Sequence, residues 1–166
     1  MAYLLVPFGG LRDINLEAGE TVVVCPATGG FGGAGVQVAI AMGARVIAMG
    51  RNEKELARLK DHARKGTPGA SIETVKMTGD ESTDLAPLKA FGTIDAVLDF
   101  TPRVASKSRH MKSAIKALRR GGRVSVMGFI GQDVMDFELA WKIVGDNITL
   151  KGKLMYEREG YDVPQK

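Results

Sequence analysis

The sequence predicts an α/β fold, a doubly wound parallel six-stranded sheet with helices on both faces. Three observations predict it: short β-branched runs alternate with amphipathic stretches, the first run (TVVVC, residues 21–25) is continuously apolar, and a glycine-rich turn follows it. Strands that are apolar on both sides are typical of parallel sheets, because helices cover both faces. Right-handed crossovers join such strands. We therefore expect one domain with strand order 3-2-1-4-5-6.

Six segments have the length and composition of buried strands. They are residues 21–25, 45–49, 72–77, 95–100, 123–127 and 148–154. Helical spacing of apolar residues follows the glycine-rich turn and recurs in residues 52–64, around 85–91, in 106–119 and in 137–144. Asn52 and Glu55 have the spacing of a helix N-cap and its partner. This alternation is the element order of a doubly wound domain.

Composition excludes several other classes of protein. The chain has 166 residues and a formal charge of +4, with one cysteine, so an internal disulfide or a cysteine-rich zinc cluster is excluded. His62 and His110 lie far apart in stretches rich in Lys and Arg, where we expect them to face solvent. The Lys and Arg residues of 103–123 have helical spacing, which favours a solvated helix face over a nucleic-acid surface.

The first ten residues, MAYLLVPFGG, do not form a signal peptide. They have no basic start before the apolar stretch, and Pro7 interrupts it. No apolar run reaches the roughly 18 residues of a membrane helix. We expect an intracellular, cytoplasmic protein that does not bind membranes.

The glycine-rich turn between the first strand and the first central helix predicts a dinucleotide site. Strand, turn, helix and second strand follow in the required order, and the pyrophosphate binds free backbone N–H groups at the helix N-terminus. A frame that starts where the strand ends places Ala27, Gly29 and Gly32 at the three motif positions. The literal match begins at Gly30, inside the predicted helix. A tight turn without a ligand is the alternative.

Two further glycines, Gly33 and Gly35, are expected to permit close packing of this helix on the sheet. A P-loop is excluded because no Lys followed by Ser or Thr comes after the last glycine. A methyltransferase loop normally has an acidic residue at the end of the second strand, where Gly50 stands.

The end of the second strand indicates which cofactor binds. An NAD site has a carboxylate there for the ribose 2′-hydroxyl, and that carboxylate would repel a 2′-phosphate. This chain has Gly50, Arg51 and Asn52 instead, which leaves room for a phosphate and a guanidinium to pair with it. The prediction is NADP(H). Two alternatives to these cofactor roles stay open. Arg51 could be a solvated turn residue, and Asn52 could serve only as the cap of the following helix.

Four stretches together resemble the cofactor domain of the medium-chain dehydrogenase/reductase superfamily. They are LEAGETVVVCPATGGFGGAGVQVAIAMGARVIAMGR, IDAVLDF, RRGGRVSVMGF and ITLKGKLMY, in the order of the family and within residues 11–156. The ATGGFG turn is closer to the quinone-reductase branch than to typical alcohol dehydrogenases. The resemblance implies a Rossmann-type NADP(H)-binding domain over residues 1–156 and a tail over 157–166. It also implies that the GroES-like catalytic domain of full-length members is absent, and with it any zinc site.

The resemblance also assigns cofactor contacts. The pyrophosphate would lie at residues 28–32, the adenosine ribose and its phosphate at 50–51, the next ribose at 100–101 and the nicotinamide at 128–129, with 152–154 near the carboxamide. The predicted cofactor-binding residues are Ala27, Thr28, Gly29, Gly30, Phe31, Gly32, Gly50, Arg51, Asn52, Phe100, Thr101, Gly128 and Phe129.

The predicted function is hydride transfer between NADP(H) and a carbonyl, alcohol or activated alkene of a small-molecule substrate. The sequence names no catalytic residue. The Tyr-x-x-x-Lys pair of short-chain dehydrogenases is absent, Cys25 is interpreted as structural, and Asp99 is a weak site candidate. Tyr156 could donate a proton, but nothing orients it. The predicted protein partner is a second copy of this chain, paired through the sixth strand, or another chain that carries the catalytic domain.

Two alternatives to this interpretation stay open. One is a dinucleotide-binding regulatory or scaffold module without enzymatic activity. The other is an enzyme of unrelated chemistry that uses the cofactor cleft for a different ligand.

Overall fold

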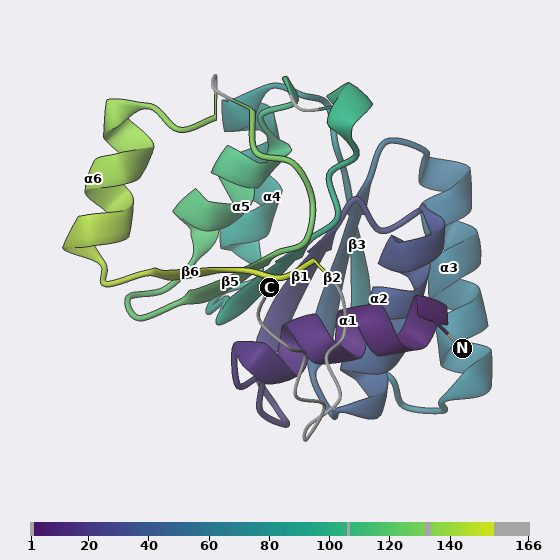
Figure 1. The fold of residues 1–166 in the computed structure, drawn as a ribbon. Helices are drawn as coiled ribbons and strands as arrows, with labels where there is room; N and C mark the ends of the chain where they lie inside the picture. Colours follow the sequence, from purple (N-terminus) through teal and green to yellow (C-terminus); the bar gives the residue numbers. More distant parts are fainter. Residues whose placement is uncertain (1, 106, 132–133, 155–166) are drawn as a thin grey trace, which may run out of the picture.

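The sheet has the predicted strand order. The computed structural model describes residues 2–105, 107–131 and 134–154, and its six parallel strands are ordered β3-β2-β1-β4-β5-β6 (Figure 1). The strands are β1 (Thr21–Cys25), β2 (Arg45–Gly50), β3 (Ile72–Lys76), β4 (Ala96–Asp99), β5 (Arg123–Val126) and β6 (Thr149–Gly152). The predicted Rossmann-type α/β class is therefore confirmed.

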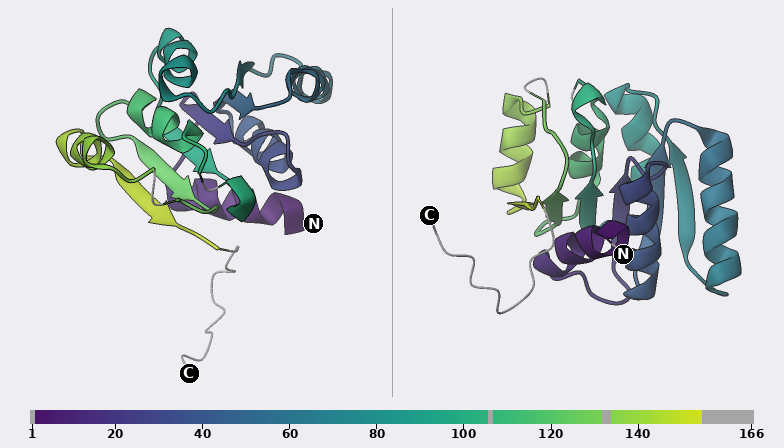
Figure 2. Two further views of the ribbon diagram at one scale, coloured as in Figure 1. Left: turned by 90° about the horizontal axis from the view of Figure 1, so that it is seen from above. Right: turned by 45° about the vertical axis from the view of Figure 1, so that its right-hand side comes forward.

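Six α-helices cover the two faces of the sheet (Figure 2). They are α1 (Ala2–Asp13), α2 (Gly30–Ala41), α3 (Glu53–Gly66), α4 (Glu81–Ala90), α5 (His110–Ala117) and α6 (Phe137–Gly145), with a short 3-10 helix at Arg103–Ala105. One apolar core lies between the sheet and α1, α2 and α3, and the other lies between the sheet and α4, α5 and α6. None of the described helices is long and apolar enough to span a bilayer.

The central strand β1 supplies side chains to both cores. Val22 and Val24 pack toward α1–α3, whereas Val23 and Cys25 pack toward α4–α6, and all four are fully buried. This alternation follows from the two-residue period of a strand. Both faces of the strand need apolar residues, which explains the continuous run TVVVC.

Helix α1 was not predicted from the sequence. It contains Pro7 and two adjacent glycines, which disfavour a helix interior. A Cβ atom at Gly10 would lie 2.5 Å from Met127 Sδ and 2.7 Å from Ser125 Oγ, so the helix backbone lies directly on β5. Tertiary packing of this glycine therefore outweighs the weak local propensity.

Several predicted elements are shorter in the structure, most of all one helix and the last strand. The helix predicted over 106–119 is α5, which begins at His110, and its Met111, Ile115 and Leu118 face the core as predicted. The last strand ends at Gly152, which pairs with the final residue of β5, rather than at 154. The predicted domain end at 156, Tyr156 and the tail 157–166 lie outside the described residues.

An ion-pair network joins the helices on the α4–α6 face. The ammonium group of Lys112, a residue only 5% exposed, lies 2.6 Å from Asp136, 2.8 Å from Glu81 and 3.3 Å from Glu138. Lys116 contacts Glu81 and Glu138 as well. Partial burial alone would raise the pKa of Glu81, but the hydrogen bonds and charges of the two lysines outweigh it and lower that pKa. The network therefore stabilises the packing of α5 between α4 and α6.

We predict that Glu81→Gln lowers the free energy of unfolding at pH 7 by about 2 kcal/mol, because it removes charge-assisted hydrogen bonds. The folded-state pKa of Glu81 lies below its usual 4.5, so its stabilisation is present above that pH. It is lost as the pH falls through the folded-state value. Urea unfolding at pH 7 and pH 3 should show the two proteins converging in acid.

The matched control for this variant is Glu138→Gln. Glu138 belongs to the same network, but its side chain is 67% exposed. We expect this substitution to leave the free energy of unfolding nearly unchanged, because solvent screens an exposed ion pair. Equal losses for both variants, or a Glu81→Gln deficit that persists in acid, would contradict the role given to Glu81.

Candidate cofactor site

The main cleft lies at the carboxyl ends of β1 and β4, where the strand order reverses. Ligands bind at this switch point in open α/β sheets. The cleft has a volume of about 490 Å³. Its lining residues are Pro26, Thr28, Gly29, Gly30, Phe31, Gly32, Arg51, Met77, Phe100, Thr101, Pro102, Ala105, Ser108, Met127, Gly128 and Phe129.

The first turn of α2 opens into this cleft. Gly29 is the N-cap, has extended backbone angles and provides no side-chain cap to the helix. The first N–H groups of a helix have no partner within the helix, so those of α2 are available to a ligand. A Cβ atom at Gly29 would meet nothing within 4 Å. The space beside the turn is therefore free, as a pyrophosphate site requires.

The earlier motif frame matches the structure. The helix begins at Gly30, so the literal glycine match does lie inside it. A Cβ atom at Gly32 would lie 2.0 Å from the Pro26 carbonyl oxygen, because the end of β1 crosses the first turn of α2. No side chain larger than hydrogen fits there. Gly32 is thus the glycine that permits the loop to fold.

The expectations for the next two glycines have different outcomes. At Gly35 an added Cβ would lie 3.0 Å from atoms of Leu98 and Phe100, so close packing of helix on sheet is confirmed. At Gly33 the closest atom would be 3.7 Å away, which is ordinary contact. The prediction for Gly33 was wrong because the tight crossing occurs one residue earlier.

The end of the cleft where the sequence predicts the adenosine ribose lies at the end of β2. Thr28 packs against Gly50, where an added Cβ would lie 3.0 Å from the threonine methyl group. Arg51 is exposed and lines both the cleft and an adjoining depression that Lys54 and Lys76 also line. The carboxylate of Glu53 lies 3.1 Å from Lys76. This end of the cleft therefore carries an excess of positive charge.

Asn52 caps α3 as the sequence predicted. Its side-chain oxygen accepts hydrogen bonds from the backbone N–H groups of Lys54 and Glu55, at 3.0 and 3.3 Å. It lines the depression beside Arg51 rather than the main cleft. Its cap role is confirmed, and a cofactor role remains a proposal.

At the other end of the cleft, the segments that follow β4 and β5 touch. A Cβ atom at Gly128 would lie 2.2 Å from the Thr101 backbone nitrogen and 2.6 Å from Asp99 Oδ2. The Phe129 N–H donates to the Thr101 carbonyl oxygen at 2.9 Å. These contacts hold the two predicted pairs, 100–101 and 128–129, in one wall.

An aromatic row forms the remaining side of the cleft. The ring of Phe31 stacks on that of Phe100, with centroids 6.1 Å apart, and meets Tyr3 of α1 at 4.9 Å. Phe31 stands where the superfamily usually has valine. The ring partners of Phe31 come from two separate segments, and Tyr3 of α1 contacts this lining residue without lining the cleft itself.

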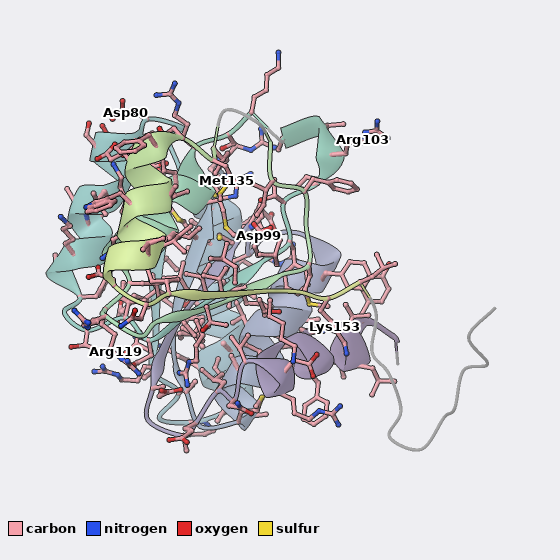
Figure 3. The ribbon with its side chains drawn as sticks, turned by 60° about the vertical axis from the view of Figure 1, so that its left-hand side comes forward. Asp80, Asp99, Arg103, Arg119, Met135 and Lys153 are labelled. Atoms are coloured by element: carbon pink, nitrogen blue, oxygen red, sulfur yellow. The ribbon has the colours of Figure 1, made fainter. Side chains whose placement is uncertain are left out.

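The prediction that His110 faces solvent was wrong, whereas His62 is exposed as expected. His110 is fully buried, with Nε2 2.9 Å from Thr101 Oγ1 and Nδ1 2.7 Å from Ser108 Oγ. Thr101 Oγ1 in turn donates to Asp99 Oδ1 at 2.5 Å. Figure 3 shows Asp99 inside the molecule, below Arg103 and Met135. Asp99 is therefore a buried partner of the cleft wall and not part of its lining.

Cys25 lies beside these residues and is buried, as predicted. Its sulfur, a carboxylate oxygen of Asp99 and a ring nitrogen of His110 all lie within 4.8 Å of one another. Burial and the nearby Asp99 charge raise the pKa of the Cys25 thiol, so it stays protonated. The Thr101 hydroxyl bonds both Asp99 and His110. We therefore interpret the group as a hydrogen-bonded chain.

Sequence analysis placed most of the lining residues correctly but missed Ser108. No motif contains it, and its significance comes from a contact with a histidine that was expected at the surface. Ala27 and Gly50 lie behind the main cleft: Ala27 is fully buried, and its N–H donates to the Met49 carbonyl. Gly152 and Leu154 do not line the cleft among the described residues.

An open helix N-terminus facing a cleft at the switch point of a doubly wound sheet defines a dinucleotide-binding domain of the dehydrogenase class. Residues 30–165 match the family model described as zinc-binding dehydrogenase. The chain therefore belongs to this family, in the medium-chain dehydrogenase/reductase superfamily, and corresponds to its cofactor-binding domain.

Relatives and solved structures agree with this family. The chain is 28% identical over 155 residues to alcohol dehydrogenase 1 of Caenorhabditis elegans, covering 93% of this chain and 41% of the relative. It superposes on a quinone oxidoreductase from Thermus thermophilus, solved also in its complex with NADPH, with a TM-score of 0.65 and 25% identity over 91% of this chain and 43% of that one. An NAD-dependent alcohol dehydrogenase gives a TM-score of 0.71 at 25% identity, with 93% and 42% covered. The chain thus spans about two fifths of these proteins.

We predict that Gly32→Ala lowers the free energy of unfolding by about 3 kcal/mol, because its Cβ would overlap the Pro26 carbonyl oxygen. The neighbouring Gly33→Ala is the matched control and should gain up to about 1 kcal/mol from helix propensity. Urea unfolding of both variants measures the difference. Similar stabilities for the two would show that the loop does not cross α2 as described.

Proposed function

We propose that this chain binds NADP(H) for a hydride-transfer reaction. The observation that carries the proposal is the uncapped first turn of α2, which opens into a cleft of about 490 Å³ beside Arg51. The residues present fit the cofactor: Gly29 leaves space for the pyrophosphate, and no carboxylate follows β2 directly. The similar quinone oxidoreductase from Thermus thermophilus forms a complex with NADPH, which supports the same choice.

The 2′-phosphate would bind at Arg51. Lys54 and Lys76 line the same depression, so three cationic side chains surround it against one carboxylate, Glu53. A phosphate dianion favours such a cluster, and the planar guanidinium of Arg51 can donate two hydrogen bonds to it. The same cluster would gain less from the uncharged 2′-hydroxyl of NAD(H).

The bound cofactor supplies the hydride chemistry, and this chain binds and orients it. Thr28 to Gly32 would hold the pyrophosphate, and the wall built from Thr101, Gly128 and Phe129 would lie beside the nicotinamide. The substrate would be a small carbonyl, alcohol or activated alkene, the class indicated by the alcohol dehydrogenase and quinone oxidoreductase relatives. A catalytic domain in another chain or segment would complete the substrate pocket.

A second copy of the chain would pair along β6. This strand is the edge of the described sheet, and its residues Thr149 and Lys153 donate backbone hydrogen bonds inward to β5. Alternate residues therefore present their N–H groups outward. Exposed Phe137, Trp141 and Val144 of α6 lie at the same end of the sheet (Figure 1).

We predict that Arg51→Ala weakens NADPH binding on the order of 30-fold, because a charge-assisted contact is worth about 2 kcal/mol. NADH binding should stay nearly unchanged, since NADH has no 2′-phosphate. Fluorescence titration and thermal shift with both nucleotides measure the effect. Equal losses for NADPH and NADH would remove the 2′-phosphate assignment.

Two control variants separate the phosphate contact from the pyrophosphate site. Arg120→Ala changes an exposed guanidinium that follows α5 and lines neither the main cleft nor the depression beside Arg51, so it should leave both affinities unchanged. Gly29→Ala fits the free chain but places a methyl group beside the pyrophosphate position, so it should weaken both nucleotides. Full NADPH affinity in Gly29→Ala would show that the nucleotide binds elsewhere.

We predict that the chain sediments as a dimer and that Gly152→Pro shifts it toward the monomer. The substitution removes an outward-facing N–H of the edge strand, and an added Cβ there meets nothing within 4 Å. Analytical ultracentrifugation over a concentration series measures the dissociation. A monomeric parent chain at high concentration, or a Gly152→Pro dimer of equal strength, would exclude pairing through β6.

A further inference from the structure

A row of four polar side chains runs from the wall of the cleft into the core. Ser108 is half-buried and lines the cleft, and its hydroxyl contacts His110. His110 contacts the Thr101 hydroxyl, which donates to the Asp99 carboxylate. Thr101, His110 and Asp99 are 0–3% exposed. We name these four residues, Ser108, His110, Thr101 and Asp99, the polar relay.

The hydrogen bonds of the relay determine where its protons lie. Thr101 has one hydroxyl hydrogen and donates it to Asp99 Oδ1. The ring nitrogen Nε2 of His110 must therefore be the donor in its 2.9 Å contact with Thr101 Oγ1. In the neutral ring this leaves a lone pair on Nδ1, which accepts the hydroxyl hydrogen of Ser108. The remaining lone pairs of Ser108 Oγ are then available to a group in the cleft.

The buried end of the relay can stabilise a positive charge on His110. Asp99 Oδ1 lies 3.8 Å from His110 Nε2, and Oδ2 has no hydrogen-bond partner among the described residues. A buried carboxylate whose second oxygen is unsatisfied favours a nearby cation. An imidazolium formed at His110 would therefore be held by Asp99 through Thr101.

Two other titratable groups on the elements around His110, Cys25 and Lys112, do not oppose this effect. On β1, the thiol of Cys25 stays protonated because burial and the Asp99 charge raise its pKa. On α5, Lys112 is paired with Glu81 of α4 and with Asp136 before α6. Asp99 is thus the one carboxylate within 4 Å of the His110 ring in the part of the chain that the structure describes.

The relay is tied to the end of the cleft proposed for the nicotinamide. Thr101 accepts the N–H of Phe129 at 2.9 Å, and Gly128 packs against Thr101 and Asp99. Ser108 reaches this wall through His110 and Thr101. The relay therefore opens on the Phe129 end of the cleft, away from Arg51 on the end of β2.

Resting on the proposed function, we propose that Ser108 exchanges the proton that accompanies hydride transfer, with His110 as its reservoir. In oxidation, the hydroxyl proton of an alcohol substrate passes to Ser108 Oγ as the proton of Ser108 passes to His110 Nδ1. A bound oxidised nicotinamide would accept the hydride of the same substrate, so the alcohol would lose two electrons and become a carbonyl. In reduction, the proton returns from His110 through Ser108 to the carbonyl oxygen. Ser108 is the group that touches substrate, and His110, Thr101 and Asp99 act through it.

The first test reads the proton positions directly, without turnover. Two-bond 15N–1H spectra of the full chain labelled at histidine, with His62→Asn for assignment, should show neutral His110 protonated on Nε2 and bare on Nδ1. Ser108→Ala should move the Nδ1 resonance, and Ser108→Thr should restore it. A proton on Nδ1 would overturn the relay, because Ser108 could not then give its proton to the ring.

The second test reads the link between the relay and the cofactor. A protonated His110 repels an oxidised, cationic nicotinamide but not a reduced one. The NADP⁺ to NADPH affinity ratio should therefore be lower in acid, where His110 carries the proton, than in base. The contribution of the 2′-phosphate to binding cancels in this ratio, because NADP⁺ and NADPH both carry that phosphate. His110→Asn should flatten the dependence, and His62→Asn, on the exposed face of α3, should retain it.

The outcomes separate the relay from the proposed function. If neither nucleotide binds, the proposed function fails and the relay fails with it. If both bind and the ratio is flat in the parent chain, or still rises in His110→Asn, only the relay is overturned. Should His110→Asn not fold, Thr101→Val takes its place and is also expected to flatten the ratio, with Thr101→Ser as the variant that preserves the rise.

Discussion

The cofactor site depends on one close backbone contact, the crossing of the Pro26 carbonyl over Gly32. An added Cβ would lie 2.0 Å from that oxygen, so the loop can fold only over a glycine. The crossing directs the chain from the end of β1 into α2 and leaves the first turn of the helix facing the cleft. Thr28 then lies against Gly50, and the end of the cleft predicted for the adenosine lies beside Arg51. Each predicted phosphate contact follows from this geometry.

Local patterns predicted the parts of the fold that local sequence determines. Strands buried on both faces need unbroken apolar runs, and TVVVC and its counterparts supplied them. The frame of the glycine turn was predicted because the strand end limits where the turn can start. Helix α1 was missed because Pro7 and its neighbouring glycines disfavour a helix, and the residues that Gly10 contacts, Ser125 and Met127, lie far away in sequence. Helix propensity depends on local sequence and cannot predict a contact between residues that are distant in the chain.

The same limit explains the polar relay. Asp99 could be placed near the ligand-binding edge, since it ends a strand, but its burial depends on Gly128 from the segment that follows β5. His110 was expected at the surface because basic residues surround it in sequence. The structure buries it because the segment after β4 turns back and offers the Thr101 and Ser108 hydroxyls to its two nitrogens. A histidine can be buried at low cost only when both nitrogens have partners.

The two ends of the cleft carry opposite charge, and this polarity matches NADP(H). Arg51, Lys54 and Lys76 gather at the end of β2, whereas the carboxylate of Asp99 lies buried beneath Gly128 at the other end. The cofactor has an anionic 2′-phosphate at one end and, when oxidised, a cationic ring at the other. The exposed lysines act through solvent, but Asp99 acts through protein, where a charge is screened far less. In the proposed complex, the buried carboxylate would therefore be the stronger determinant of cofactor redox preference, and the relay through Thr101 and His110 would connect it to the cleft.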